Sequence, residues 1–318
     1  MQQTIRIATR GSALARTQAA WVAERLTMHH PNLKVETHII KTLADAHQEI
    51  PLHGFRQRGV FVKEIENALL NGEADLAVHS MKDLPADIPD GLVVGAVPPR
   101  EDPLDVLVLR DEPAPLKAGI PLPEGALVGS SSLRRQAQLR HHRPDLRFCD
   151  LRGNVDTRLR KLDEGAMDAI ILAAAGLIRL GLAERISARL PEEISLPAVC
   201  QGALAIECRA DDESTLTLLQ PLEDSETRCC VTAERALLRA LGGGCAVPVG
   251  GLARIEGTAL VLQGAIAAPD GTRLVREIQT GSPDDPEGLG AALGARLLAT
   301  GGQEILQEMH SQRGIQDA

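Results

Sequence analysis

Short apolar runs alternate with helix-spaced apolar positions along the first hundred residues. Three runs have the length and content of buried strands: TIRIAT (4–9), KVETHII (34–40) and DLAVH (75–79). The positions that mark helices between them are Ala15, Ala19, Val22 and Leu26, then Phe61, Ile65, Ala68 and Leu69. Ser12 precedes the first helix as its expected cap. This alternation predicts a parallel sheet covered by helices on both faces.

The same alternation restarts after the proline-rich stretch at 98–103. It predicts strands at 126–129, 146–150 and 169–173, with helices that begin at Ser131 and Asn154. LPAVCQGALAIECR (196–209) is expected to be an extended segment that returns the chain to the first unit. The pattern therefore indicates two α/β units.

The last hundred residues have a different pattern. A helix is expected over 225–241, followed by three short strands at 245–255, 258–267 and 273–280 with glycine-bearing turns between them. A glycine-weakened helix over about 287–310 is expected to cover them. The fold class is therefore α/β, with two lobes and a small C-terminal α+β domain built on a three-stranded antiparallel sheet. The domains are predicted at 1–101 with 202–220, at 102–201 and at 221–318.

Composition narrows the function classes for this chain of 318 residues. A net charge of −9, three Phe, one Trp and no Tyr argue against binding to nucleic acid by charge or by stacking. No apolar run has the length of a signal peptide or a membrane span. The six cysteines lack zinc-type spacing and are expected to be reduced thiols. We expect a cytoplasmic protein without a membrane or nucleic-acid partner.

Positive charge is concentrated in one part of this acidic chain. Between Arg134 and Lys161 there are nine Lys or Arg residues against Asp145, Asp150 and Asp156. Arginine binds carboxylates and phosphates through two parallel hydrogen bonds. The cluster therefore indicates a small ligand with several negative charges, although a solvated basic face is the simpler alternative.

Polar and basic residues also follow the predicted strands. Loops at the carboxyl ends of such strands form the usual ligand crevice of α/β sheets. The residues placed there are Arg10, Ser12, Lys82, Asp83, Ser132, Arg134, Arg135, Arg152, Arg158 and Arg179. The chain contains no GxxxxGK[ST], GxSxG, HExxH or strand-linked GxGxxG motif, and its histidines lack metal spacing. We predict a two-lobed anion-binding cleft and no metal site.

RALGGGCAVPVG (239–250) follows the helix of the third unit. Gly242 is expected to end that helix in a left-handed conformation. The glycines remove side chains from around Cys245, so its sulfur is approachable. The alternative is a small buried cysteine in a tight corner.

Eight motifs in this order closely resemble those of the porphobilinogen deaminase (hydroxymethylbilane synthase) family. They are ATRGSALA, FVKEIE, VHSMKDLP, SSLRRQAQL, LRGNVDTRLRKL, ILAAAGLIRLG, QGALAIECR and GGGCAVPVG, and they span nearly the whole chain. The resemblance implies two lobes like those of periplasmic binding proteins and a third domain whose cysteine holds a covalent dipyrromethane cofactor. The implied enzyme, a transferase, joins four porphobilinogen molecules head to tail, releases ammonia at each condensation and frees the linear tetrapyrrole by hydrolysis.

The resemblance also implies residue roles. Cys245 matches the cofactor cysteine, and Asp83 matches the catalytic aspartate. The positions that match cofactor-binding residues are Lys82, Ser132, Arg134 and Arg135, and those that match substrate-binding residues are Arg10, Ser12, Arg152, Arg158 and Arg179. The chain departs from the family in the loop 42–59, where Arg58 is expected to replace a lysine. A monomer is expected.

Two other hypotheses remain at this point. A non-enzymatic two-lobed anion-binding module explains the lobes and the arginines but not Cys245 or the third domain. A cysteine-nucleophile hydrolase explains Cys245 but not the arginines.

Overall fold

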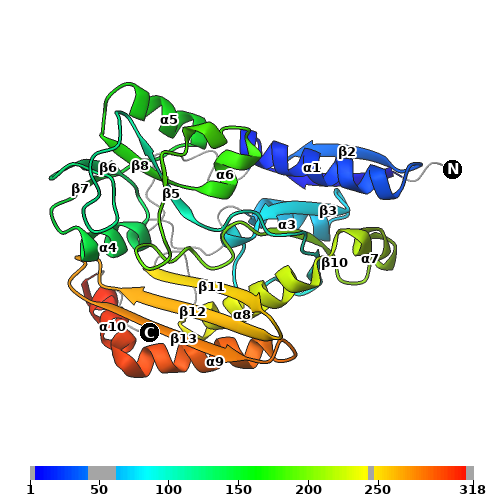
Figure 1. Cartoon of the computed structure of the whole chain (residues 1–318). Coiled ribbons are helices and arrows are strands. Elements are labelled where there is room, and N and C mark those ends of the chain that lie inside the picture. The colour runs from blue at the N-terminus through cyan, green and yellow to red at the C-terminus, as the bar shows by residue number, and fades with distance from the viewer. Residues whose placement is uncertain (1–3, 42–61, 243–246, 313–318) are drawn as a thin grey trace.

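The computed structural model describes residues 4–41, 62–242 and 247–312, and its first lobe is built on a five-stranded sheet. The strand order is β2-β1-β3-β10-β4, from β1 (Thr4–Thr9), β2 (Lys34–Ile39), β3 (Leu76–Ser80), β4 (Leu92–Ala96) and β10 (Leu204–Arg209). Helices α1 (Ala13–His29) and α7 (Glu213–Leu219) share one apolar cluster with the sheet, and α3 (Lys63–Leu70) shares another. Helices therefore cover both faces, as predicted (Figure 1).

The second lobe repeats this architecture without a repeat in the sequence. Its strand order is β7-β6-β8-β5-β9, from β5 (Asp105–Leu109), β6 (Leu127–Gly129), β7 (Arg147–Cys149), β8 (Ala169–Ala173) and β9 (Ala188–Arg189). Helix α4 (Leu133–His142) lies on one face, and α5 (Val155–Asp163) and α6 (Ala174–Arg179) lie on the other. The two sheets thus have the same arrangement of strands.

The strands that the apolar pattern predicted within each lobe are parallel, as expected, but each sheet also contains a strand that runs antiparallel to its neighbours. In the first lobe β10 runs antiparallel to both β3 and β4, and in the second lobe β5 runs antiparallel to both β8 and β9. Both β10 and β5 are reached from the other lobe, so neither follows a crossover helix that would return the chain to the start of the sheet. The sequence pattern also missed β4, β5 and β9.

Two segments cross between the lobes side by side, one between β4 and β5 and the other between β9 and β10. The backbone N–H of Glu101 donates to the carbonyl of Gly202 at 3.2 Å, and Nε of Arg100 donates to the carbonyl of Gln201 at 2.9 Å. Gly202 has φ +90°, and a Cβ there would lie 2.3 Å from the Glu101 carbonyl oxygen. A glycine is therefore required where the two segments meet. The return of β10 to the first sheet was predicted correctly, while the domain boundaries stay a prediction.

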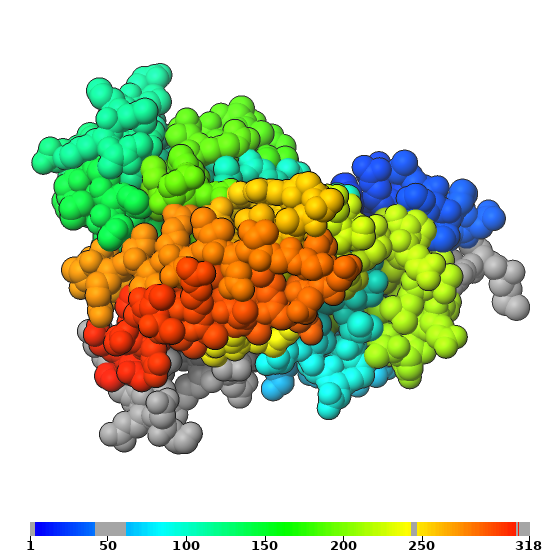
Figure 2. All heavy atoms as spheres, turned by 60° about the horizontal axis from the view of Figure 1, so that its bottom comes forward, coloured from blue at the N-terminus to red at the C-terminus, as the bar shows by residue number. Residues whose placement is uncertain are grey.

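The C-terminal unit contains the expected antiparallel sheet, formed by β11 (Val249–Glu256), β12 (Ala259–Ala267) and β13 (Leu274–Gly281). Helices α8 (Ser225–Ala240), α9 (Pro286–Leu297) and α10 (Gln303–Gln312) share its apolar core. The single helix expected over 287–310 is interrupted at 298–302, where Gly301 has φ +114°. Figure 2 shows this unit, in orange and red, extending across one side of both lobes.

Two predicted helix ends are confirmed. The Ser12 hydroxyl accepts from the backbone N–H of Ala15 at 3.3 Å and caps α1. Gly242 follows α8 with φ +83°, and its N–H donates to the Arg239 carbonyl at 3.0 Å. Residues 243–246 lie outside the described part, so the predicted exposure of Cys245 stays a prediction.

Candidate active site

Lys82 and Asp83 lie where β3 ends, as the sequence predicted. They form a single 3-10 turn, η2 (Met81–Asp83). Nζ of Lys82 donates to Oε1 of Gln201 at 3.2 Å, so this turn is held against the segment that returns from the second lobe. The strand end of the first lobe therefore lies at the junction of the lobes.

The two predicted strand-end loops of the first lobe come together beside this turn. A cavity of about 70 Å³ is lined by Arg10, Ser12 and Asp83, together with residues of α1 and β3. Arg10 and Ser12 follow β1, which is the parallel neighbour of β3 in the sheet. Because β1 and β3 are neighbours in the sheet, Ser12 and Asp83 line the same small cavity although they lie about 70 positions apart in the sequence.

The matching loop of the second lobe presents its arginines differently from the prediction. The Ser132 hydroxyl accepts the backbone N–H of Arg135 at 3.5 Å and caps α4. Nη1 of Arg134 lies 2.6 Å from Oδ2 of Asp105, and Nε of Arg135 lies 2.9 Å from Oδ1 of the same carboxylate. Other N–H groups of these guanidiniums donate to the carbonyls of Leu196 and Ile171. Both side chains are therefore held in fixed positions by the protein itself.

Asp105 is the anchor of this cluster. It is fully buried and also accepts from Ser195 Oγ at 2.8 Å and from Gln201 Nε2 at 2.9 Å. Burial acts to raise the pKa of Asp105, but the two guanidiniums outweigh it and hold the pKa well below its usual range. Asp105 is therefore ionised at any physiological pH.

The cluster carries more positive than negative charge. Burial and the nearby Arg135 lower the pKa of Lys82 to about 8, while Asp83 acts in the opposite direction. Burial and the charge of Arg135 likewise lower the pKa of Arg158 to about 10, and Asp83 opposes this. Among the described residues, the four cations Lys82, Arg134, Arg135 and Arg158 thus share a neighbourhood with the two carboxylates of Asp83 and Asp105. An excess of buried positive charge suits a ligand with several carboxylates.

Two other predicted site residues, Arg152 and Arg179, lie in different parts of the junction between the lobes. The charge of Arg152 lowers the pKa of Arg158, so these two arginines are neighbours. Arg179 lies farther along the junction, where its Nη2 donates to the Gly202 carbonyl at 2.7 Å. Burial lowers the pKa of Arg179, opposed by Glu101. Arg58, the loop 42–59 and Cys245 lie outside the described residues.

Several arginines of the basic stretch 134–161 make contacts within the second lobe and do not belong to the site. Arg143 is buried and forms an ion pair with Asp145 at 2.7 Å. Arg140 stacks over the Phe148 ring at 4.8 Å, and Nε of Arg147 donates to the Gly125 carbonyl. The charge count alone therefore overestimated how many of these arginines belong to the site.

Sequence reasoning missed three residues that organise the site: Asp105, Ser195 and Gln201. Asp105 begins the apolar strand DVLVL, and an acidic residue at such a position needs a cationic partner. Gln201 lies within the motif QGALAIECR, but no local pattern indicates that its amide joins Lys82 and Asp105. Only the first of these residues could have been suspected from the sequence.

The described part of the chain contains neither a candidate metal site nor a candidate membrane-spanning helix. Its His, Cys, Asp and Glu residues form no group of three or more that could hold a metal ion. None of its helices combines the length and the apolar character needed to cross a bilayer.

Comparisons with known proteins agree along the whole chain. Residues 5–217 match the family model "Porphobilinogen deaminase, dipyromethane cofactor binding domain", and residues 228–299 match "Porphobilinogen deaminase, C-terminal domain". Porphobilinogen deaminase from Desulforudis audaxviator is 50% identical over 311 residues, covering 98% of this chain and 99% of that protein. The enzyme of the same name from Roseiflexus sp. is 52% identical over 306 residues, covering 96% and 99%.

Solved structures give a weaker likeness. A TRAP periplasmic solute binding protein from Desulfovibrio salexigens aligns with a TM-score of 0.41 and 11% identity, over 70% of this chain and 73% of that chain. The assignment of fold class therefore depends on the two α/β sheets and the C-terminal sheet of the structure itself.

Proposed function

Because the chain belongs to the porphobilinogen deaminase family, we propose which of its residues carry out that family's reaction. The protein is a transferase of tetrapyrrole biosynthesis. It joins porphobilinogen molecules into a linear tetrapyrrole and uses a dipyrromethane cofactor. The alternative of a non-enzymatic binding module is not favoured by this membership.

The buried cationic cluster fits the cofactor. Each pyrrole unit of dipyrromethane has two carboxylates, and the excess of positive charge among Lys82, Arg134, Arg135 and Arg158 favours binding of such groups. When bound, the cofactor supplies the pyrrole terminus to which substrate is joined. This match of charge is the single observation that carries the proposed assignment.

We assign cofactor binding to Lys82, Ser132, Arg134 and Arg135. Among the described contacts, each guanidinium of Arg134 and Arg135 uses three of its five N–H donors on Asp105 and neighbouring oxygens. The remaining donors can bind cofactor carboxylates without reorganisation, because Asp105 already fixes both planes. Cys245 is the proposed attachment point, from its match to the family motif.

We assign substrate carboxylates to the other basic residues around the cleft, namely Arg10, Ser12, Arg152, Arg158 and Arg179, and to Arg58 by the motif match. Arg158 is the best supported, because its charge interacts with both Arg135 and Asp83. It therefore lies near both the proposed cofactor residues and the proposed catalytic carboxylate.

Asp83 is the proposed catalytic group. Loss of ammonia from porphobilinogen leaves a cationic fragment, and its condensation leaves positive charge on pyrrole nitrogens. A carboxylate fixed at a strand end stabilises such charge without reorganisation. Asp83 lies close enough to Lys82 and Arg158 for its charge to act on both cations.

A monomer in the cytoplasm is also part of the proposal. The five described cysteines are free thiols, in line with a reducing compartment. The exposed large apolar side chains of the described residues lie on different elements, and one lies in a loop: Met28, Ile39, Leu70, Ile278 and the loop residue Leu116. Scattered residues of this kind do not require a partner surface.

Intact mass spectrometry of the purified protein tests the cofactor assignment. We expect a mass above that of the sequence by two linked pyrrole units, and a colour with an acidic pyrrole reagent. Cys245→Ser should have neither and should be inactive, because only a thioether gives a permanent primer. Cys149→Ser is the control and should retain both. An active protein with the bare sequence mass would contradict the proposal.

A further inference from the structure

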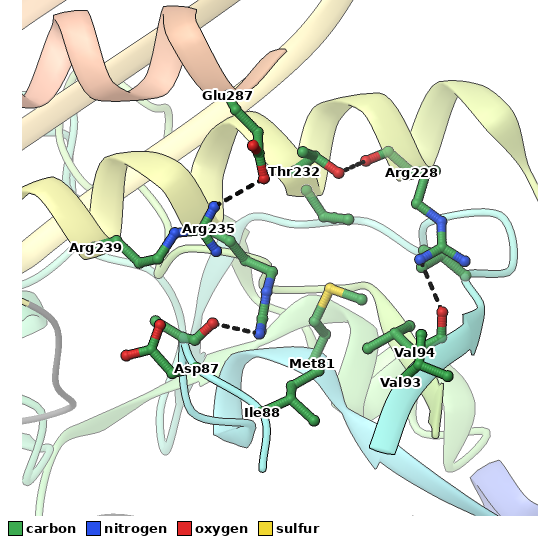
Figure 3. A pocket seen from close by; sticks show the side chains of 13 residues that line it. Met81, Asp87, Ile88, Val93, Val94, Arg228, Thr232, Arg235, Arg239 and Glu287 are labelled. Atoms are coloured by element: carbon green, nitrogen blue, oxygen red, sulfur yellow. Dashed lines mark hydrogen bonds and ion pairs between the residues drawn. The ribbon is translucent and has the colours of Figure 1, made fainter. Parts of the chain in front are cut away.

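A second cavity, of about 380 Å³, is lined by residues of the first lobe and of helix α8. Figure 3 shows it between the strand that carries Val93 and Val94 and the α8 side chains of Arg228, Thr232 and Arg235. It shares no lining residue with the small cavity that contains Asp83. Its volume is within the range of small-molecule pockets, at the lower end.

Helix α8 presents two different faces. Cys230, Ala233 and Leu237 are buried in the core of the C-terminal unit. The stripe that lines the cavity contains Arg228, Val231, Thr232, Arg235 and Arg239, which recur at helical spacing. Val231 packs against Met81 and Val97 of the first lobe, and the long basic side chains beside it line the open space.

The three arginines of the stripe differ in their partners. Nε of Arg228 lies 2.7 Å from Oε1 of Glu223, and Nη2 of Arg239 lies 3.1 Å from Oε1 of Glu287. Arg235 lies between them and donates through Nη2 to the carbonyls of Pro85 and Ala86, at 2.8 and 2.7 Å. Among the described residues no carboxylate lies within ion-pair distance of Arg235. Its half-buried charge is thus balanced by carbonyl dipoles and by carboxylates beyond ion-pair distance, including Asp87.

The opposite wall of the cavity is apolar. Met81, Ile88, Val93, Val94 and Val97 line it, and several of these side chains face the stripe in Figure 3. Asp87 is the acidic residue of this wall, and its charge acts to raise the pKa of Arg235 while burial lowers it. One guanidinium beside an apolar wall suits a molecule with one carboxylate and an apolar body.

We propose that this cavity is a second binding site, for a small monocarboxylate with an apolar body of about ten non-hydrogen atoms. The carboxylate pairs with Arg235, and the body contacts Ile88, Val93 and Val94. The ligand class differs from porphobilinogen, which has two carboxylates and an amine.

The cavity lies next to the catalytic turn and to helix α8, so a bound ligand should affect turnover. Met81 directly precedes Lys82, and α8 leads to the segment that contains Cys245. A ligand here contacts the helix before the cofactor cysteine and lies beside the buried first residue of the catalytic turn. Occupancy should therefore change kcat without competing with porphobilinogen. This consequence depends on the proposed function, whereas binding itself does not.

The probe is 3-phenylpropionate, and its uncharged amide is the matched control ligand. Binding to the purified holoenzyme is measured by calorimetry and located by crystal soaking. We expect a Kd on the order of 1 mM for the acid and no detectable binding of the amide. Arg235→Gln should weaken binding at least tenfold, whereas Arg160→Gln, on the exposed surface of α5, should leave it unchanged.

Val94→Trp provides a second test that keeps Arg235 and its carbonyl contacts. It fills the cavity and should abolish binding even if Arg235→Gln does not fold. Asp83→Asn holoenzyme should bind the acid with unchanged Kd, so the site is tested separately from the catalytic assignment. Equal binding of acid and amide, unchanged binding in Val94→Trp, or displacement of the acid by porphobilinogen would each overturn the proposal.

Discussion

Asp83 and Asp105 are both carboxylates among cations, but their surroundings give them different tasks. Asp105 is fully buried, and its oxygens are taken up by Arg134, Arg135 and neighbouring polar groups. Asp83 lies on a strand-end turn and lines a small cavity. A carboxylate that stabilises a developing charge must line a cavity that the substrate can enter, as Asp83 does. A carboxylate that orients other residues can be fully buried, as Asp105 is.

Replacement of Asp83 tests the catalytic assignment. Asp83→Asn should fold and load its cofactor but lose nearly all turnover, because a neutral amide does not stabilise positive charge on the pyrrole nitrogens. Asp83→Glu should keep a small residual activity. Steady-state kinetics should show a fall in kcat and little change in KM. An Asp83→Asn enzyme with full activity would assign the catalytic carboxylate elsewhere.

Replacement of Asp105 should act through the arginines. Asp105→Asn leaves two buried guanidiniums without their counter-ion, so we expect lower stability and a protein that does not load its cofactor. Intact mass and thermal unfolding measure the two effects. Asp145→Asn is the control, because it unpairs the buried Arg143 in the same lobe away from the site. It should lower stability but leave the cofactor in place; equal cofactor loss in both variants would contradict the anchoring role.

At the scale of elements, buried acidic residues lie where helix α3 packs on the first sheet: Glu66 on α3 and Glu207 on β10. His79 on β3 and Glu207 on β10 are in contact at 2.9 Å between Nε2 and Oε2. Glu66 on α3 is 7% exposed, and its Oε1 and the Oε1 of Glu207 have no hydrogen-bond partner among the described residues. Burial and the charges of Glu207 and Glu64 raise the pKa of Glu66 to about 7, while His79 acts to lower it.

This packing predicts a pH-dependent stability. Below the ordinary Glu pKa of 4.5 both folded and unfolded states hold the proton. Between 4.5 and about 7 only the unfolded state releases it, so stability falls as pH rises and the full loss is present above 7. Glu66→Gln should therefore raise the Tm by several degrees at pH 8 and leave it nearly unchanged at pH 4.5. Thermal unfolding at both pH values measures this, with the exposed Glu24→Gln as control. An equal effect at both pH values would contradict the raised pKa.

At the scale of the whole molecule, the three units meet at Glu234 of α8. Its carboxylate accepts from Arg100 Nη1 at 2.5 Å, from the backbone N–H of Cys200 at 2.5 Å and from that of Ala253 at 2.8 Å. Arg100 and Cys200 belong to the two crossing segments, and Ala253 belongs to β11. One buried side chain thus joins both lobe connections to the C-terminal sheet.

Glu234→Gln should therefore destabilise the whole protein. Loss of one partner of a buried ion pair typically costs 3–5 kcal/mol, so we expect roughly that decrease in the free energy of unfolding. Denaturant unfolding measures it. Glu164→Gln breaks the exposed pair with Arg160 on α5 and should cost less than about 0.5 kcal/mol. Similar losses in the two variants would show that Glu234 does not join the units.

The sequence by itself determined the local features. The strands at 4–9 and 169–173, the cap at Ser12 and the left-handed Gly242 follow from apolar spacing and from the conformational preference of one residue. The motifs indicated the family, and the strand-end rule put Lys82 and Asp83 at the junction of the lobes. Each of these depends on residues close together along the chain.

Only the tertiary structure decided which distant residues meet. Apolar spacing reports that a strand is buried but not its direction, so the antiparallel β5 and β10 could not be predicted. Asp105 is 29 positions from Arg134 and 96 from Gln201, and no local pattern joins them. Burial made their charges strong enough to organise a site, because the interior screens charge far less than water does. That burial arises only when β5, helix α4 and the segment before β10 fold together around the same carboxylate.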